Sequence, residues 1–243
     1  LMLMQINVFK RYEKKYLVTE EQLIKMMPEI NRHMLPDEYS LDGKKYSIYN
    51  IYYDTENYDL IRRSMERPYY KEKFRLRAYE PFSAMDNKIF MEMKKKIGGV
   101  VSKRRTTVSL QEAIAFVNDG IRPYADSRME NQVLDEMEYF MSINKLTRGL
   151  FISYERMAFF GRTDSGLRLT FDSKINARKE DIFSSDMSGN TPLLDDGKYI
   201  MEIKVSESIP LWIAELMSEL GIRRVKFSKY GTAYSMGICG RNV

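Results

Sequence analysis

Histidine and cysteine are almost absent from this sequence. Its 243 residues include one cysteine, Cys239, and one histidine, His33. A single cysteine excludes an intrachain disulfide and a multi-cysteine zinc site. A single histidine excludes Ser-His-Asp and Cys-His catalysis unless His33 itself is the base. The polar neighbours Asn31 and Arg32 favour an ordinary surface position for it.

Long apolar runs are also missing. No run of about 18 apolar residues occurs, so no transmembrane helix is predicted. The stretch from Leu1 to Gln5 is too short for a signal-peptide core and has no basic residues before it. We therefore expect a cytoplasmic protein. A hydrophobic content of 44% is enough for one good core, and we expect a single domain over residues 1–243.

What the sequence does contain is a set of short segments with charged residues at every second position. Side chains two apart on a strand point to the same face, so each predicted strand presents one charged row. One row alone is typical of a solvated strand face, and only the co-occurrence of several indicates a shared site. Cations that face one another are unstable unless a multiply charged anion lies among them, which predicts binding of polyphosphate-like anions. The five rows are Arg11-x-Glu13-x-Lys15, Arg75-x-Arg77, Glu92-x-Lys94, Lys103-x-Arg105 and Glu202-x-Lys204.

Strand patterns dominate the chain, and helices lie between them. Alternation and β-branched or aromatic content predict strands over 9–18, 46–53, 73–79, 88–95, 100–109, 150–160, 167–175 and 198–206. Capping boxes, glycine stops and apolar periodicity predict helices over 19–29, 109–120, 131–145, 210–221 and 230–236. The polar stretch 178–196 is expected to be a long exposed loop. We predict an α+β fold: an eight-stranded antiparallel β-barrel that forms a tunnel, with peripheral helices.

Twelve cations are candidates for the anion site, against few acids. Arginine makes bidentate contacts to phosphate and lysine supplies a compact charge. At least one acid is expected to hold a divalent metal, and phosphoryl transfer then needs positioning and charge rather than a histidine or cysteine nucleophile. The cations are Arg11, Lys15, Arg75, Arg77, Lys94, Lys103, Arg105, Arg156, Arg168, Lys204, Lys226 and Lys229; the acids on matching faces are Glu13, Glu92 and Glu202, and Asp172 shares a face with Arg168.

Read together, these segments resemble the VTC domain, the polyphosphate-polymerase branch of the triphosphate tunnel metalloenzyme (CYTH-like) superfamily. The resemblance runs from the segment around Lys15 to the Lys226-Phe227-Ser228-Lys229 segment and covers most of the chain. The segments that carry it include Phe74-Arg75-Leu76-Arg77, Glu92-Met93-Lys94, Lys103-Arg104-Arg105, Tyr154-Glu155-Arg156, Arg168-Leu169-Thr170-Phe171-Asp172 and Glu202-Ile203-Lys204.

The resemblance implies a basic tunnel that binds ATP, another triphosphate or polyphosphate, with Mn²⁺ or Mg²⁺ at Glu202 and with Glu13 and Glu92 as further candidate ligands. It implies transfer of the γ-phosphate of ATP to polyphosphate. The superfamily opens with two acids before the lysine, and Arg11 stands in place of the first. That departure weakens a two-metal hydrolase reading. The residues expected to act in catalysis are Arg75, Arg77, Lys94, Arg156, Arg168, Glu202 and Lys226.

Two other functions stay open on the sequence. A tunnel triphosphatase would use water as the acceptor and would need more carboxylates to hold metal and orient water. A non-catalytic polyphosphate-binding module would bind anions without turnover. Nucleic acid is a weaker alternative, and DNA is not an expected partner, because the tyrosines of 46–53 are interpreted as core rather than as a base-stacking platform.

Overall fold

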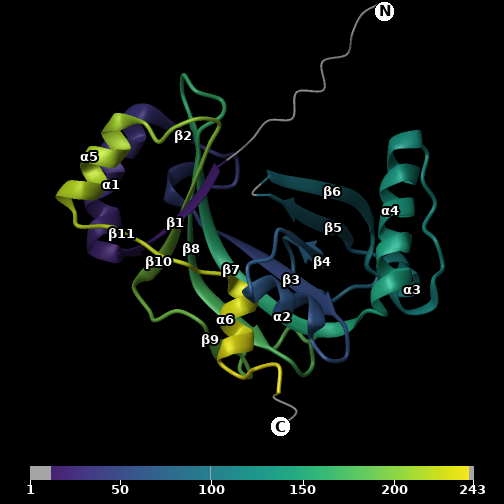
Figure 1. Ribbon diagram of the computed structural model, residues 1–243. Helices are drawn as coiled ribbons and strands as arrows, with labels where there is room; N and C mark the ends of the chain where they lie inside the picture. Colours follow the sequence, from purple (N-terminus) through teal and green to yellow (C-terminus); the bar gives the residue numbers. More distant parts are fainter. Residues whose placement is uncertain (1–11, 99, 241–243) are drawn as a thin grey trace, which may run out of the picture. The chain divides into compact units, whose positions relative to one another are not determined.

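The computed structural model describes residues 12–98 and 100–240, and it divides into two compact units (Figure 1). Unit 1 consists of residues 1–44, 157–171 and 197–226, and unit 2 consists of residues 45–156, 172–196 and 227–243. Two long strands, β7 (Thr147–Gly161) and β8 (Arg168–Arg178), contribute to both units. A single domain over 1–243 therefore remains a prediction, while the chain itself has two internally packed parts.

Unit 1 is built around the antiparallel pair β1 (Tyr12–Thr19) and β10 (Lys198–Val205). Helices α1 (Glu20–His33) and α5 (Leu211–Glu219) accompany the pair, with the short elements β2 (Met34–Pro36), η1 (Leu41–Gly43) and β11 (Arg223–Arg224). The predicted capping box at Thr19 is present and begins α1. Its apolar core includes Val18, Met26 and Ile213, each fully buried.

Unit 2 contains the meander β3 (Tyr46–Asp54), β4 (Tyr70–Ala78), β5 (Lys88–Ile97) and β6 (Val100–Ser109), all antiparallel. Helices α3 (Leu110–Asp119) and α4 (Arg128–Asn144) pack against β5 and β6 (Figure 1). The remaining elements are α2 (Asp59–Met65), β9 (Thr191–Pro192) and α6 (Lys229–Ser235). The predicted Ser109 cap and Gly120 stop bound α3.

The prediction of an eight-stranded closed barrel is wrong, although the antiparallel α+β class is confirmed. Hydrogen bonds join 11 strands in the order β11-β1-β10-β8-β7-β3-β4-β5-β6, with β2 paired to β7 and β9 to β8. Among the described residues the terminal strands β11 and β6 are not paired with each other, so the sheet is open. All eight predicted strands exist; the three additional strands are two or three residues long, too short to show a period of two.

The stretch 178–196 is not simply an exposed loop. Ile182 and Leu193 are buried, and Ile182 belongs to the apolar core of unit 2. Arg178 is only 6% exposed and lies over the ring of Phe151. Apolar anchors at both ends thus fix a segment whose middle is polar.

Within the part of the chain that the structure describes, none of the helices combines the length and the apolar character that a membrane crossing requires.

Candidate functional site

One face of the β4–β5–β6 meander carries three charged rows side by side. The antiparallel register places Arg75 opposite Glu92 and Glu92 opposite Arg105. One step along, Lys94 lies between Lys73 and Lys103. The rows predicted from the sequence therefore share one face, as neighbours across a sheet rather than from opposite walls of a barrel.

Glu92 is the acid at the centre of this face and is 1% exposed. Its Oε2 accepts from Arg75 Nε at 2.9 Å and Arg75 Nη2 at 2.6 Å, and Arg77 Nε lies 3.8 Å away. Its Oε1 lies 2.6 Å from Lys103 Nζ and 3.6 Å from Arg105 Nε. One carboxylate thus orients four cations, which leaves the face strongly positive.

The pKa values on this face follow from burial and from the excess of positive charge. Burial would raise the pKa of Glu92, but Arg75, Arg77 and Lys103 outweigh it and hold that pKa well below its usual range. Burial lowers the pKa of Lys103 to about 8, although the nearby Glu92 opposes the shift. Additional negative charge near Lys103 would favour its protonated form.

Two tyrosines belong to the same cationic surroundings, and the sequence reasoning did not select them. The Tyr52 hydroxyl accepts from Arg75 Nη1 at 2.9 Å, and the Tyr154 hydroxyl accepts from Arg77 Nη2 at 3.3 Å. Burial would raise the pKa of Tyr52, but Arg75, Lys73, Arg77 and Lys229 together lower it to about 8. Tyr52 lies in the tyrosine-rich segment 46–53, and Tyr154 lies two residues before Arg156. Neither belongs to a charged row, so the charge pattern could not identify them.

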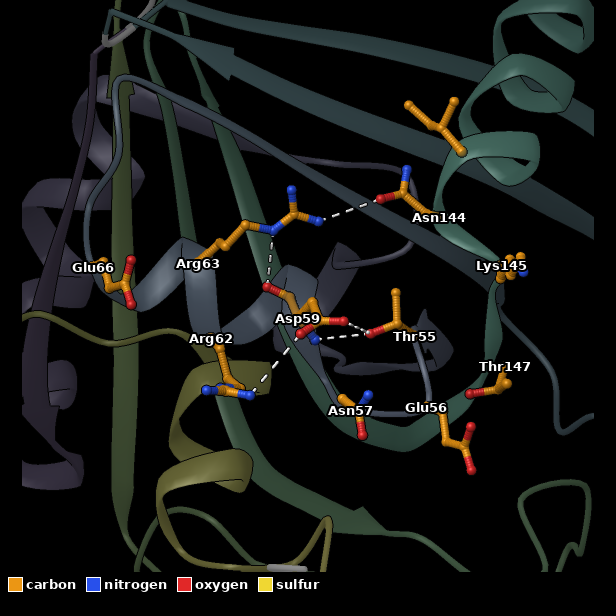
Figure 2. Close-up of a pocket in the computed structure, with 11 residues that line it drawn as sticks. Thr55, Glu56, Asn57, Asp59, Arg62, Arg63, Glu66, Asn144, Lys145 and Thr147 are labelled. Atoms are coloured by element: carbon orange, nitrogen blue, oxygen red, sulfur yellow. Dashed lines mark hydrogen bonds and ion pairs between the residues drawn. The ribbon is translucent and has the colours of Figure 1, made fainter.

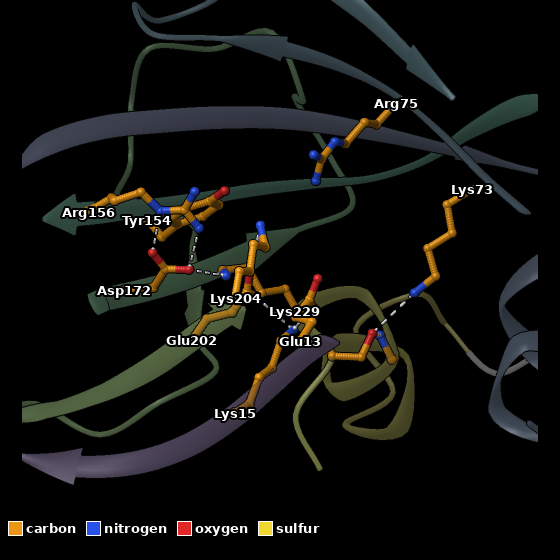
Figure 3. Close-up of polar contacts among 12 residues, drawn as sticks. Glu13, Lys15, Lys73, Arg75, Tyr154, Arg156, Asp172, Glu202, Lys204 and Lys229 are labelled. Carbon is orange, nitrogen blue, oxygen red and sulfur yellow. Dashed lines mark hydrogen bonds and ion pairs between the residues drawn. The ribbon is translucent and has the colours of Figure 1, made fainter. Parts of the chain in front are cut away.

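A second buried acid, Asp172, gathers two of the predicted phosphate ligands. Asp172 on β8 accepts from Arg156 Nε at 2.7 Å and Arg156 Nη2 at 2.8 Å, and Lys229 of α6 donates to its Oδ2. Figure 3 shows both cations converging on this carboxylate beside Tyr154. Burial would raise the pKa of Asp172, but Arg156 and Lys229 outweigh it and lower the pKa to about 2. The carboxylate therefore stays ionised and holds the two cations in place.

In unit 1, two acids and two lysines alternate across the β1–β10 pair. Lys15 Nζ lies 3.6 Å from Glu13 Oε1 and 3.5 Å from Glu202 Oε2, and Lys204 Nζ lies 2.8 Å from Glu202 Oε1 (Figure 3). The register pairs Glu13 with Lys204 and Lys15 with Glu202, so all four lie on one face. This is the pattern that the sequence rows predicted for these strands.

Glu13 and Glu202 place two carboxylates on one face of the β1–β10 pair. Mg²⁺ is often held by one or two carboxylates together with substrate phosphates and water. No group of three or more metal-binding side chains occurs among the described residues, so phosphate and water would have to supply the remaining ligands. Glu92, by contrast, is enclosed by four cations, a setting that suits an ion-pair centre better than a metal ligand.

The remaining predicted residues lie in different settings. Arg168, at the start of β8, stacks over Phe160, and its buried Nε has no hydrogen-bond partner among the described residues. Lys226 is exposed just after β11. Arg105 lies over the ring of Phe90. Arg11 lies outside the described residues. His33 stacks on Trp212, and its Nε2 lies 3.4 Å from Glu29. Neither of these contacts involves a candidate cation.

The sequence reasoning also missed three lysines on the cationic face. Lys71 and Lys96 lie opposite each other, and Lys73 lies opposite Lys94. The signal was present, because Lys71-x-Lys73-x-Arg75-x-Arg77 is one continuous row. Lys71 and Lys96 were left out because the strands were predicted to begin at residue 73 and to end at residue 95, whereas β4 begins at Tyr70 and β5 ends at Ile97; Lys73 lay inside the predicted strand and was not selected. Lys73 Nζ donates to Ser228 Oγ at 3.2 Å.

A cavity of about 680 Å³ lies elsewhere in unit 2, and none of the predicted residues lines it (Figure 2). Its wall mixes acids with bases, and Arg63 already donates to the Asp59 carbonyl and to Asn144. The cavity has no excess of one charge, so its chemistry does not point to a polyanion.

Similarity to one solved structure agrees with this fold. A candidate adenylate cyclase from Bacillus halodurans shares 16% sequence identity with a TM-score of 0.53, over 90% of this chain and 95% of that one. One from Vibrio parahaemolyticus shares 13% identity with a TM-score of 0.48, over 92% and 97%. No curated protein matches the chain. The family model described as the VTC domain matches residues 10–237, and the chain belongs to that family.

Proposed function

We propose that the chain is a metal-dependent phosphotransferase that binds a nucleoside triphosphate or polyphosphate and transfers the γ-phosphate of ATP to polyphosphate. The observation that carries the proposal is the charge of the β4–β5–β6 face. Among the described residues of these strands, the Glu92 carboxylate lies on a face with many cationic side chains. They are Lys71, Lys73, Arg75, Arg77, Lys94, Lys96, Lys103 and Arg105.

In this proposal Arg75, Arg77, Lys94 and Lys103 bind the triphosphate, with Glu92 orienting the arginines. Arg156 and Lys229 of the same unit hold the transferring phosphoryl group and the chain, with Arg105 as a further phosphate ligand. In unit 1, Arg168, Lys226, Lys15 and Lys204 are proposed as phosphate ligands, and Arg11 is proposed from the sequence alone. A terminal oxygen of the acceptor polyphosphate forms a bond to the γ-phosphorus, the bond from that phosphorus to the β–γ bridging oxygen breaks, and ADP leaves. These side chains act by position and charge.

Glu202 is the proposed metal ligand, with Glu13 beside it. Mn²⁺ or Mg²⁺, when bound, would neutralise charge on the phosphate oxygens. Lys15 lies within 3.6 Å of both carboxylates and Lys204 Nζ lies 2.8 Å from Glu202 Oε1, so the two lysines orient them.

The test is incubation of the protein with γ-labelled ATP, polyphosphate and Mn²⁺ or Mg²⁺, followed by separation of products by chain length. We expect labelled polyphosphate from the wild type and none from Glu202→Gln. The matched control is Glu215→Gln, an exposed acid on α5 of the same unit. Labelled orthophosphate alone would identify a triphosphatase. Binding of triphosphate without turnover would identify a binding module.

A further inference from the structure

One buried acid of unit 2 lies outside the proposed set of phosphate and metal ligands. This is Asp54, the last residue of β3, whose side chain is fully buried. Tyr230 Oη of α6 donates to its Oδ2 at 3.0 Å. The same carboxylate accepts from the backbone amides of Thr55, Leu60 and Ile61. Asp54 therefore joins α2 on one side to α6 on the other.

The Tyr230 side chain fits closely into its surroundings. Its ring stacks on Tyr52, with the ring centroids 5.0 Å apart and the planes 25° from parallel. A Cβ atom at Gly149 of β7 would lie 2.8 Å from Tyr230 Oη, closer than such atoms pack, so a larger residue there would push the hydroxyl away from Asp54. The stack and the glycine together fix the hydroxyl in the position from which it reaches the carboxylate.

The residues that precede Tyr230 face the cationic site. Lys229 donates to Asp172 Oδ2, and its Nζ lies 4.1 Å from the centroid of the Tyr154 ring (Figure 3). Ser228, the N-cap of α6, accepts from Lys73 Nζ at 3.2 Å. A lysine side chain loses much conformational freedom when it is ordered, so a fixed backbone beside it favours one orientation. The bond between Tyr230 and Asp54 supplies such a fixed point one residue away.

We propose that Tyr230 is a positioning residue: through its hydrogen bond to Asp54 it holds the start of α6 so that Lys229 stays beside Asp172, oriented to bind phosphate. This inference rests on the proposed function, because it takes Lys229 as a phosphate ligand. It adds that the affinity contributed by Lys229 depends on a buried hydroxyl in the neighbouring residue.

The test is a double-mutant cycle on tripolyphosphate binding, measured by calorimetry with Tyr230→Phe, Lys229→Gln and the double variant. Tyr230→Phe keeps the ring that stacks on Tyr52 and removes only the hydroxyl. We expect each single change to weaken binding about threefold to tenfold, the usual effect of one lost hydrogen bond or ion contact. The double variant should bind about as weakly as Lys229→Gln alone, because residues that act as one unit are not additive.

Two controls accompany the cycle. Tyr234→Phe removes a hydroxyl from the same helix, where the Tyr234 ring contacts Tyr58, and it should bind like the wild type. Tyr230→Phe combined with Lys103→Gln on β6 should give additive losses. Where Tyr230→Phe does not fold, Gly149→Ala tests the same bond, because the added methyl group displaces the hydroxyl while Tyr230 and Asp54 both remain.

A lower Tm of Tyr230→Phe with unchanged tripolyphosphate affinity would make Tyr230 a purely structural residue and overturn the inference. So would an equal loss of affinity whether residue 229 is lysine or glutamine, in Tyr230→Phe or in Gly149→Ala. These results leave the proposed function standing. Failure of the wild type to bind tripolyphosphate, or wild-type affinity in Lys229→Gln, would instead overturn the proposed role of Lys229, and this inference with it.

Discussion

At the scale of single residues, Glu92 decides the charge balance of the β4–β5–β6 face. It is buried and touches four cations, so its loss would leave them without a counter-charge. Removing one partner of a buried ion pair costs more than the pair contributes, because the other partner stays desolvated and unpaired. The same residue would therefore link fold stability to the proposed anion binding.

We expect Glu92→Gln to lower the free energy of unfolding by about 3 kcal/mol in phosphate-free buffer. Tripolyphosphate should restore much of this loss, because it supplies the missing negative charge. Denaturant unfolding with and without tripolyphosphate measures both effects. Glu72→Gln, on the opposite face of the neighbouring strand, is the control and should show no comparable rescue. A destabilised Glu92→Gln protein that tripolyphosphate fails to rescue would contradict this account.

Tyr52 should titrate near pH 8, because Arg75, Lys73, Arg77 and Lys229 outweigh the effect of burial on its pKa. Its folded-state pKa of about 8 lies below the unfolded value of about 10. Ionisation therefore stabilises the folded protein only as pH rises above about 8, and this contribution is absent below it. The phenolate also competes with ligand for Arg75, so tripolyphosphate affinity should fall above that pH.

The measurement is the ultraviolet absorbance of tyrosinate as a function of pH, followed by binding at two pH values. One tyrosine should ionise near pH 8 in the wild type and none in Tyr52→Phe. Tyr49→Phe, on the opposite face of β3, should leave that ionisation in place. If the ionisation near pH 8 persists in Tyr52→Phe, it belongs to another tyrosine.

At the scale of elements, the sequence predicted correctly those strands and helices whose boundaries depend on neighbouring residues. The predicted strand 100–109 coincides with β6, and both caps of α3 were visible as Ser109 and Gly120. Helix α2 was missed because its N-cap residue, Tyr58, makes no side-chain cap; instead the Asp54 carboxylate, at the end of β3, accepts from the backbone of Leu60 and Ile61. No spacing rule for adjacent residues reports such a contact.

The contribution of one such local contact, the Ser109 N-cap of helix α3, can be measured directly. Ser109 Oγ accepts from the Glu112 amide at 3.2 Å, and the Ser109 amide donates to Glu112 Oε2 at 2.8 Å. Ser109→Ala should lower the free energy of unfolding by about 1 kcal/mol. Denaturant unfolding compares it with Ser102→Ala, an exposed serine on the same strand. Equal stability of the two variants would show that the cap contributes little.

At the scale of the whole molecule, the sequence could indicate which face of each strand is charged but not how the sheet ends. Alternation fixes the face, whereas closure depends on whether two edge strands meet, and no pattern along one strand encodes that. The rows of Arg75, Glu92 and Arg105 share one face of the sheet, where they lie side by side rather than on opposite walls. The pairing of Asp172 with Lys229 links positions 57 apart in sequence and was likewise beyond local reasoning.

The excess of neighbouring cations on the β4–β5–β6 face should make the stability of the whole protein depend on bound anion. A ligand that binds only the folded state adds about 2.7 kcal/mol of stability when its concentration is a hundred times its dissociation constant. For a chain of this length that corresponds to a rise in Tm of about 5 to 10 °C.

We expect this rise in Tm from tripolyphosphate in a thermal unfolding experiment. Sulfate at equal ionic strength should give a much smaller rise, because sulfate is too short to neutralise several cations together. Arg75→Gln should reduce the response to tripolyphosphate toward the sulfate level. A Tm that does not move with millimolar tripolyphosphate would mean that the fold tolerates its cationic face without a ligand, and the assignment of that face to phosphate binding would have to be abandoned.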